Sequence, residues 1–305
     1  MKCNLCPRAC NVDRNVNTGF CGMTNDIYAA RAALHMWEEP CISGEHGSGA
    51  VFFSGCTLRC IFCQNAEIAA AHVGKKITVE RLSDIFLELQ DKCANNINLV
   101  TATHFVSQVA EALVKAKNKG LVIPVVYNSS AYENVSTLKI LDGLVDVYLP
   151  DMKYIDSRLS AEYSKAPDYA DVAKAAIQEM VRQTGKPEFF TDDDELVKSG
   201  SVEAGIMKKG VIVRHLVLPG TTKDSKAVIK YLLDTYADEI YISIMSQYTP
   251  FDRLKNHPLL SRKVTRKEYD SVVDYAIECG INNGFIQEGD VAEESFIPEF
   301  DYEGI

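Results

Sequence analysis

From residue 51 the chain reads Val51-Phe52-Phe53-Ser54-Gly55-Cys56-Thr57-Leu58-Arg59-Cys60-Ile61-Phe62-Cys63-Gln64-Asn65. An apolar run predicts a buried strand that ends at Ser54-Gly55, and three cysteines follow with three and two residues between them. In a parallel α/β fold, the loop after a strand is the usual place for an active site. A [4Fe–4S] cluster ordinarily takes four cysteines, so three would leave one iron open to a substrate or cofactor.

Other apolar runs predict the remaining strands of such a fold. They cover residues 50–54, 98–100, 123–127, 145–149, 211–218 and 240–244, and each is short, as buried parallel strands are. Between them, residues 82–89, 106–114 and 269–277 carry apolar side chains at helical spacing, and Gly280 marks the end of the last helix. This alternation predicts a parallel sheet with covering helices, either open or curved into a barrel, with its chemistry at the carboxyl ends of the strands.

Composition limits the partners of the chain. Its 305 residues, 47% of them hydrophobic, can form one large domain or two small ones, and 32 basic against 42 acidic residues give a formal charge of −10. That charge argues against nucleic acid as the main partner. The N-terminus lacks the apolar core of a signal peptide and no eighteen apolar residues run uninterrupted, so we expect a cytoplasmic enzyme with no membrane partner and free thiols.

The spacing Cys-x3-Cys-x2-Cys, with the aromatic Phe62 directly before the last cysteine, resembles the signature of radical S-adenosylmethionine (radical SAM) enzymes. The strings at 63–65, 149–153 and 213–220 are similar to those of the activating enzymes of pyruvate formate-lyase and to their little-characterised iron–sulfur homologues. The resemblance implies an α/β fold, a partial (β/α)6 barrel. We expect this barrel over residues 50–288, after a Cys-rich, loop-rich N-terminal extension (1–49) and before a C-terminal tail (289–305).

The resemblance also implies the chemistry. Cys56, Cys60 and Cys63 would hold a [4Fe–4S] cluster whose open iron binds S-adenosyl-L-methionine (SAM), and the reduced cluster would cleave SAM to methionine and a 5′-deoxyadenosyl radical. In the activases this radical takes a hydrogen atom from a glycine of a glycyl radical enzyme, and ferredoxin or flavodoxin supplies the electron. Two alternatives stay open: a radical SAM enzyme acting on a small metabolite or another peptide, and a non-enzymatic iron–sulfur electron carrier.

Further site residues are carried over from the family by position. Those expected around SAM are Phe62, Asn65, Thr101, Thr103, Asn128, Ser129, Asp151, Lys153 and Arg214. Arg214 would reach the methionine carboxylate, whereas the threonine hydroxyls would replace the family's Gly-Gly-Glu motif as acceptors for the amino group. The alternative for Asn128, Asp151 and Arg214 is a loop cap or a salt bridge. The candidate substrate residues are His104, Gln247 and Tyr248, although a histidine at such a turn equally suits a backbone hydrogen bond.

A second cysteine group precedes the first strand. Cys3, Cys6, Cys10 and Cys21 supply four thiols, enough for a closed zinc site or a second iron–sulfur cluster, and a metal-free packed group is the alternative. Because this stretch has few apolar residues, we favour a structural metal over an electron relay. Farther along, the acidic segment 190–204 predicts a solvated insertion.

Overall fold

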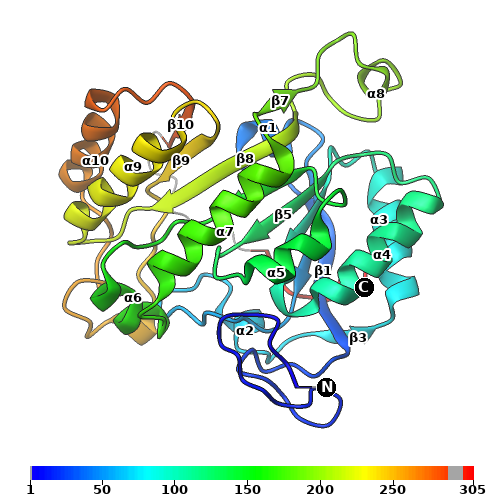
Figure 1. Ribbon diagram of the computed structural model, residues 1–305, viewed down its shortest axis with the longest axis horizontal. Coiled ribbons are helices and arrows are strands. Elements are labelled where there is room, and N and C mark those ends of the chain that lie inside the picture. The colour runs from blue at the N-terminus through cyan, green and yellow to red at the C-terminus, as the bar shows by residue number, and fades with distance from the viewer. Residues whose placement is uncertain (1, 288–297) are drawn as a thin grey trace.

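The centre of the protein is an open, largely parallel sheet (Figure 1). The structure is a computed structural model and describes residues 2–287 and 298–305. Six parallel strands lie side by side in chain order: β2 (Ser48–Phe53), β4 (Ile97–Val100), β5 (Val125–Ser129), β6 (Val147–Pro150), β8 (Met207–Leu216) and β9 (Tyr241–Met245). A further parallel strand, β10 (Gly284–Ile286), pairs with β9. The six predicted strands and the partial barrel are confirmed.

Antiparallel strands complete the sheet. They are β1 (Ile27–His35) beside β2, β3 (Lys75–Ile77) beside β1, and β7 (Glu188–Phe189) beside β8. The expectation of a loop-rich segment up to residue 49 is wrong for β1. This strand consists largely of alanines that are buried on both faces, so it shows no alternation of apolar and polar residues. The expected boundary between 288 and 289 lies outside the described residues, but residues 298–305 lie along β1, where the amide of Tyr302 donates to the carbonyl of Ala30.

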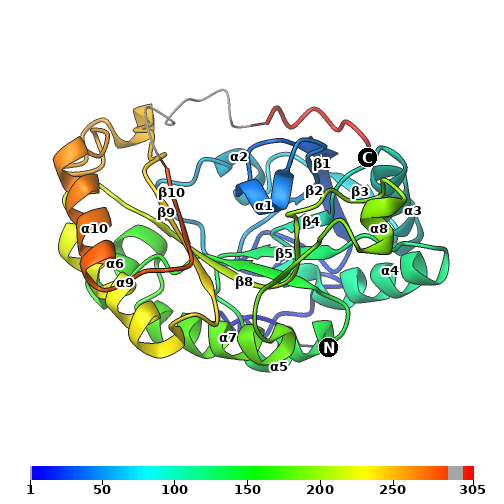
Figure 2. The same cartoon turned by 90° about the horizontal axis from the view of Figure 1, so that it is seen from above.

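Helices cover the outer face of the curved sheet (Figure 2). The longer ones are α3 (Val79–Asp91), α4 (Val106–Asn118), α6 (Ser157–Ser164), α7 (Tyr169–Thr184), α9 (Thr222–Tyr236) and α10 (Arg266–Glu278). Short helices are α1 (Pro40–Ser43), α2 (Ala66–Ala69), α5 (Val135–Leu138) and α8 (Glu195–Lys198), with 3-10 turns at Thr103–Phe105, Lys139–Leu141 and Asp252–Leu254. Figure 2 shows α1 on the inner face of the sheet. No helix in the described part of the chain has the length and apolar character needed to span a membrane.

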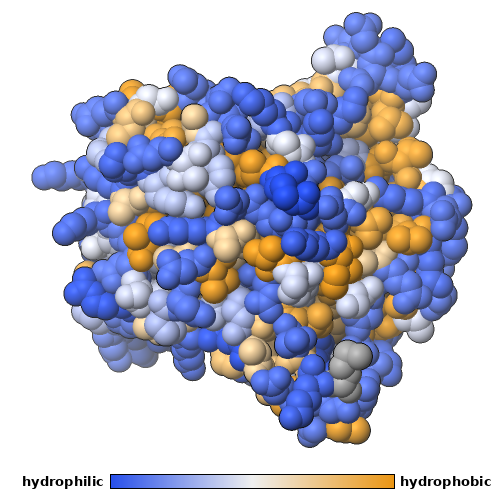
Figure 3. All heavy atoms as spheres, in the orientation of Figure 1, coloured by the Kyte–Doolittle hydropathy of each residue, from blue (hydrophilic) through white to orange (hydrophobic). Residues whose placement is uncertain are grey.

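Two segments outside the barrel differ in how they pack. Residues 2–26 pack below the carboxyl ends of the strands, beside α2 (Figure 1). The segment 190–204 projects from the opposite end, and its helix α8 buries no residue; Figure 3 shows mainly hydrophilic residues over this projection. Its solvated character is therefore as expected, although Glu203 accepts hydrogen bonds from the backbone amides of Glu45 and His46.

Candidate active site

A cavity of about 250 Å³ opens at the carboxyl ends of the parallel strands. Most of the predicted site residues line it: Cys56, Cys60, Phe62, Cys63, Asn65, Thr101, Asn128, Asp151, Lys153, Arg214 and Gln247. They come from six different strand ends, which a parallel sheet brings to one edge. The fold therefore gathers in one place residues that are up to 191 positions apart, from Cys56 to Gln247.

The loop after β2 carries the three cysteines and is held by its backbone. Gly55 has φ +87°, and a side chain there would clash with the carbonyl of Cys21, so only glycine fits this turn. Arg8 donates to the carbonyl of Thr57 (2.8 Å), and Arg253 donates to the carbonyls of Ile61 (3.0 Å) and Cys63 (2.6 Å). Neither arginine was predicted from the sequence, because each reaches the loop from far along the chain.

The three thiols have the surroundings of cluster ligands. The backbone amide of Leu58 points at the Cys56 sulfur (3.3 Å), and the Ser164 hydroxyl donates to the Cys60 sulfur (3.0 Å). Burial, opposed by the positive charge of Lys153, raises the pKa of Cys60 to about 11, and burial together with the neighbouring thiols raises the pKa of Cys63 to about 12. The thiolates therefore need positive charge from a bound metal, and these three residues fit a [4Fe–4S] cluster with one open iron.

Arg214 is the centre of a partly buried charged network beside the cysteines. Its guanidinium donates to Asp151 (3.0 Å), Glu38 (3.1 Å) and Asn128 (2.6 Å), and Lys153 donates to Asp151 (2.7 Å). Burial opposes the charge on Asp151, but Arg214 and Lys153 together lower its pKa. Arg214 thus forms the salt bridge that the sequence left open as an alternative, and it does so inside the cavity.

Glu38 belongs to this network but was not predicted from the sequence. Its carboxylate accepts hydrogen bonds from Arg214 and from the side-chain amides of Asn98 and Asn128, both at 3.2 Å. Burial raises the pKa of Glu38, and the charge of Arg214 opposes that rise. Glu38 comes from the segment after β1, outside the predicted barrel, and nothing in the local sequence distinguishes it from a solvated acid.

Four predicted residues do not line this cavity. Thr103 and Ser129 both donate to Glu133 (2.6 Å each) instead. Tyr248 donates to the carbonyl of Leu260 and packs behind the cysteine loop, with its ring centre 6.4 Å from that of Phe62. The fourth predicted residue that does not line the cavity is His104.

His104 forms the backbone hydrogen bond that the sequence allowed. Its Nε2 donates to the carbonyl of Ser54 (2.7 Å), directly before the cysteine loop. Burial lowers the pKa of His104 to about 4, so the ring is neutral near pH 7. The geometry indicates that His104 positions the loop.

Glu133 provides a pH-dependent contribution to stability. Burial raises its pKa to about 7, despite hydrogen bonds from Ser129, Thr103 and Tyr127, and its Oε2 has no partner within the described residues. The pKa of Glu133 is higher in the folded than in the unfolded protein, so the folded state favours the protonated carboxyl. The resulting contribution to the free energy of unfolding is fully present below about pH 4.5 and is lost as the pH rises through 7.

We expect the wild type to lose about 2 kcal/mol of unfolding free energy between pH 5 and pH 8 through Glu133. Glu133→Gln removes the titrating group and should lose that much less over the same range. Urea unfolding of both proteins at the two pH values measures the difference. Equal pH dependence in the two proteins would show that Glu133 does not titrate in this range.

The N-terminal cysteines are also close together. The sulfurs of Cys10 and Cys21 lie 3.3 and 3.4 Å from the position that a Cβ on Gly19 would take, and Cys10 and Cys3 are hydrogen-bonded. Burial raises the pKa of Cys6 to about 12, and the charges of Cys21 and Cys3 add to the rise. The group adjoins the other cysteines, since the amide of Cys56 donates to the carbonyl of Cys21 (3.3 Å).

Within residues 2–287 and 298–305, no three His, Cys, Asp or Glu side chains are placed to hold one metal ion together. A [4Fe–4S] cluster differs from a single ion because it spreads its ligands over several irons.

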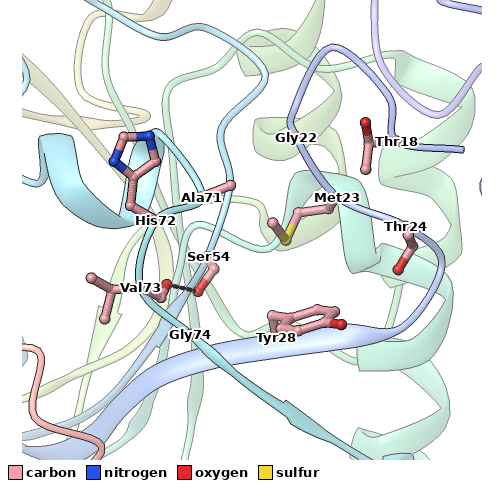
Figure 4. Close-up of a pocket in the computed structure, with 10 residues that line it drawn as sticks. All are labelled: Thr18, Gly22, Met23, Thr24, Tyr28, Ser54, Ala71, His72, Val73 and Gly74. Atoms are coloured by element: carbon pink, nitrogen blue, oxygen red, sulfur yellow. Dashed lines mark hydrogen bonds between the residues drawn. The ribbon is translucent and has the colours of Figure 1, made fainter.

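Figure 4 shows another hollow, beside the N-terminal segment. Its volume is about 240 Å³, close to that of the cavity with the cysteines. Thr18, Met23, Thr24 and Tyr28 form one side of it, and the Ser54 hydroxyl there donates to the carbonyl of Val73. None of the predicted site residues is among the ten that line this hollow. The cavity that contains the cysteines is therefore the candidate active site.

Comparison with known proteins supports this assignment. Residues 50–191 match the family model described as the Radical SAM superfamily. An uncharacterized protein of Methanocaldococcus jannaschii, MJ0674, is 28% identical over 284 residues, which are 90% of this chain and 74% of that protein.

Solved structures show the same fold. SuiB of Streptococcus suis, bound to its precursor peptide SuiA, is 14% identical, with a TM-score of 0.50 over 77% of this chain. SuiB bound to S-adenosylmethionine gives the same TM-score over 76% of this chain. This chain covers less than half the length of SuiB, 46% and 48% in the two structures.

Proposed function

We propose that this chain activates a glycyl radical enzyme, since residues 50–191 match the Radical SAM family model and the enzymes of that family hold a [4Fe–4S] cluster and use SAM. When bound, the cluster supplies one electron to SAM, which yields methionine and a 5′-deoxyadenosyl radical; this radical takes a hydrogen atom from a glycine Cα and leaves 5′-deoxyadenosine and a glycyl radical. The electron would come from a low-potential donor of the ferredoxin or flavodoxin class. The observation that carries the proposal is the meeting of Cys56, Cys60 and Cys63 with Asp151, Lys153 and Arg214 in one cavity.

Different residues of the cavity would bind the cluster and SAM. The three cysteines hold the cluster and leave one iron for SAM. Arg214 and Lys153 present positive charge toward the same space, which suits the carboxylate of SAM. The resemblance of residues 149–153 and 213–220 to activase strings supports the choice of a glycyl radical enzyme as the substrate.

Two products test the proposal. Anaerobically reconstituted protein is reduced with dithionite in the presence of SAM and a purified glycyl radical enzyme. We expect 5′-deoxyadenosine in the solution and an organic radical on the partner, detected by electron paramagnetic resonance. Formation of 5′-deoxyadenosine without a protein radical would contradict the activase function, and absence of both products would indicate an electron carrier.

We also propose a second metal site at the N-terminus, held by Cys3, Cys6, Cys10 and Cys21 and serving stability. The stretch 2–26 contains no helix or strand of its own. Pairwise interactions connect its four cysteines, and Cys21 accepts a hydrogen bond from the cysteine loop. Four thiolates can ligate the four irons of a [4Fe–4S] cluster, which spreads its ligands more widely than a single ion does, and they leave no position for substrate. A bound metal would supply the stabilisation that such a short segment lacks.

Changing all four cysteines to alanine should lower the melting temperature by about 4–8 °C, corresponding to roughly 2–3 kcal/mol in a domain of this size. The variant should also lose bound metal but keep the spectrum of the cluster at the other three cysteines. Calorimetry, metal analysis and absorption spectra measure these effects, and Cys279→Ala, which changes an exposed thiol, is the control. Iron, zinc and melting temperature equal to those of the wild type would show that the group binds nothing.

A further inference from the structure

A second cavity, of about 470 Å³, adjoins the candidate active site. The two cavities share the walls formed by Trp37, Glu38, Arg214, Met245 and Gln247. A molecule in the second cavity would therefore lie next to the space in which SAM is cleaved. Of the site residues predicted from the sequence, only the shared Arg214 and Gln247 line the second cavity.

One carboxylate in the second cavity is not satisfied. Glu39 lines the cavity and is only 8% exposed. The Ser243 hydroxyl donates to its carboxylate, but Oε2 has no hydrogen-bond partner among the described residues. A buried oxygen acceptor without a partner is costly, so a ligand that donates a hydrogen bond would be favoured here.

With all three carboxylates ionised, the charges around both cavities leave an excess of one negative charge; burial raises the pKa of Glu39, the charge of Arg214 opposes that rise, and a bound cation would favour the ionised form further. Three carboxylates, Glu38, Glu39 and Asp151, face two cationic side chains, Arg214 and Lys153. The basic groups are already engaged, since Lys153 is bound to Asp151 and Arg214 to Asp151 and Glu38. Glu39 is the carboxylate of the three that forms no ion pair within 4.0 Å in the described part of the chain, although the charge of Arg214 lies close enough to oppose the rise of its pKa.

We propose that the second cavity binds the cationic end of the substrate, an ammonium or guanidinium group on an aliphatic chain. Such a group would donate to Oε2 of Glu39 and balance its charge. The other walls include Met36, Phe285 and Ile286, which suit an aliphatic chain. Ca²⁺ or Mg²⁺ fits poorly, because each requires six or more oxygen ligands. The inference rests on the proposed function, since the radical must reach a substrate held next to SAM.

The test measures binding of simple probes to wild-type protein that is loaded with cluster and SAM but not reduced. The probes are n-butylguanidinium, n-butylammonium and the neutral n-butylurea, titrated with detection of the probe by nuclear magnetic resonance. We expect at least one cation to bind with a Kd of about 1–10 mM, as suits ligands this small, and about tenfold more tightly than the urea. Equal affinity for all three probes, or no binding up to about 50 mM, would overturn the inference.

A variant assigns the binding to Glu39. Glu39→Gln should weaken binding of the cation about tenfold, to the level of the urea, because the amide keeps the shape but not the charge. Glu45→Gln, which changes an exposed acid outside both cavities, should bind as the wild type does. Unchanged affinity in the Glu39 variant would contradict the proposal. Since no reductant is present, the result is independent of SAM cleavage, and failure of the reduced protein to form 5′-deoxyadenosine would count against the proposed function alone.

Discussion

Replacement of Cys60 by alanine is expected to reduce formation of 5′-deoxyadenosine from SAM to background. Cys60 is one of only three thiols in the cavity, so its loss leaves two ligands for a cluster that already has one open iron. Its sulfur also accepts the hydrogen bond from Ser164, which ties the loop to α6. The measurement is chromatographic detection of 5′-deoxyadenosine after anaerobic reconstitution and dithionite reduction, together with the iron content.

Two further variants make this result specific. Cys279→Ala removes an exposed thiol remote from the cavity and should cleave SAM at the wild-type rate. Simultaneous replacement of Cys56, Cys60 and Cys63 should abolish both the cluster spectrum and cleavage. Full cleavage by this triple variant would disprove the assignment of the cluster to these residues.

Much of this site follows from patterns that are local in the sequence. The spacing of Cys56, Cys60 and Cys63 lies within one loop, and the apolar runs predict the strands that precede the other residues. A parallel sheet then places all the strand ends at one edge, so residues such as Asp151 and Arg214 must meet. The family resemblance named Asp151 and Arg214 as site residues, and the predicted parallel sheet explains why both lie at the same edge.

The position of a residue at a strand end does not by itself predict whether its side chain faces the cavity. Successive residues of a strand point to opposite faces of the sheet. Asn128 therefore lines the cavity, whereas Ser129 points away from it and donates to Glu133. The family resemblance placed both Asn128 and Ser129 near SAM, but two adjacent strand residues cannot both face the cavity. Asn128 is the one that does.

The remaining site residues that the sequence did not predict reach the site from distant segments of the chain. Glu38 and Glu39 follow an alanine-rich strand without alternation, and their burial depends on the packing of β1 and α1 against the barrel. Arg8 and Arg253 act on backbone carbonyls of the cysteine loop, and such contacts require no particular residue on the partner side. These features arise from tertiary packing and have no local sequence signal.

Replacement of Arg214 by leucine is expected to weaken SAM binding by about one to two decades. A guanidinium has five N–H groups, and the side chain uses three of them on Asp151, Glu38 and Asn128. Two N–H groups have no partner among the described residues and are available to the SAM carboxylate, in a partly buried position where a charge-assisted hydrogen bond is worth about 1.5–3 kcal/mol. The network therefore holds the guanidinium in place for the ligand.

The same replacement should also destabilise the protein by about 3–5 kcal/mol, since it leaves the carboxylates of Glu38 and Asp151 buried without their common partner. Two measurements separate the effects: calorimetry gives the stability, and an equilibrium titration of the folded variant, well below its melting temperature, gives the SAM affinity. Arg214→Lys keeps the charge but has three donors in place of five, so it should recover part of the stability and less of the affinity. Arg262→Leu, which breaks a surface ion pair with Glu268, is the control for loss of an arginine and should bind SAM normally. If folded Arg214→Leu binds SAM as tightly as the wild type, Arg214 serves only the network with Glu38 and Asp151, and another group must hold the SAM carboxylate.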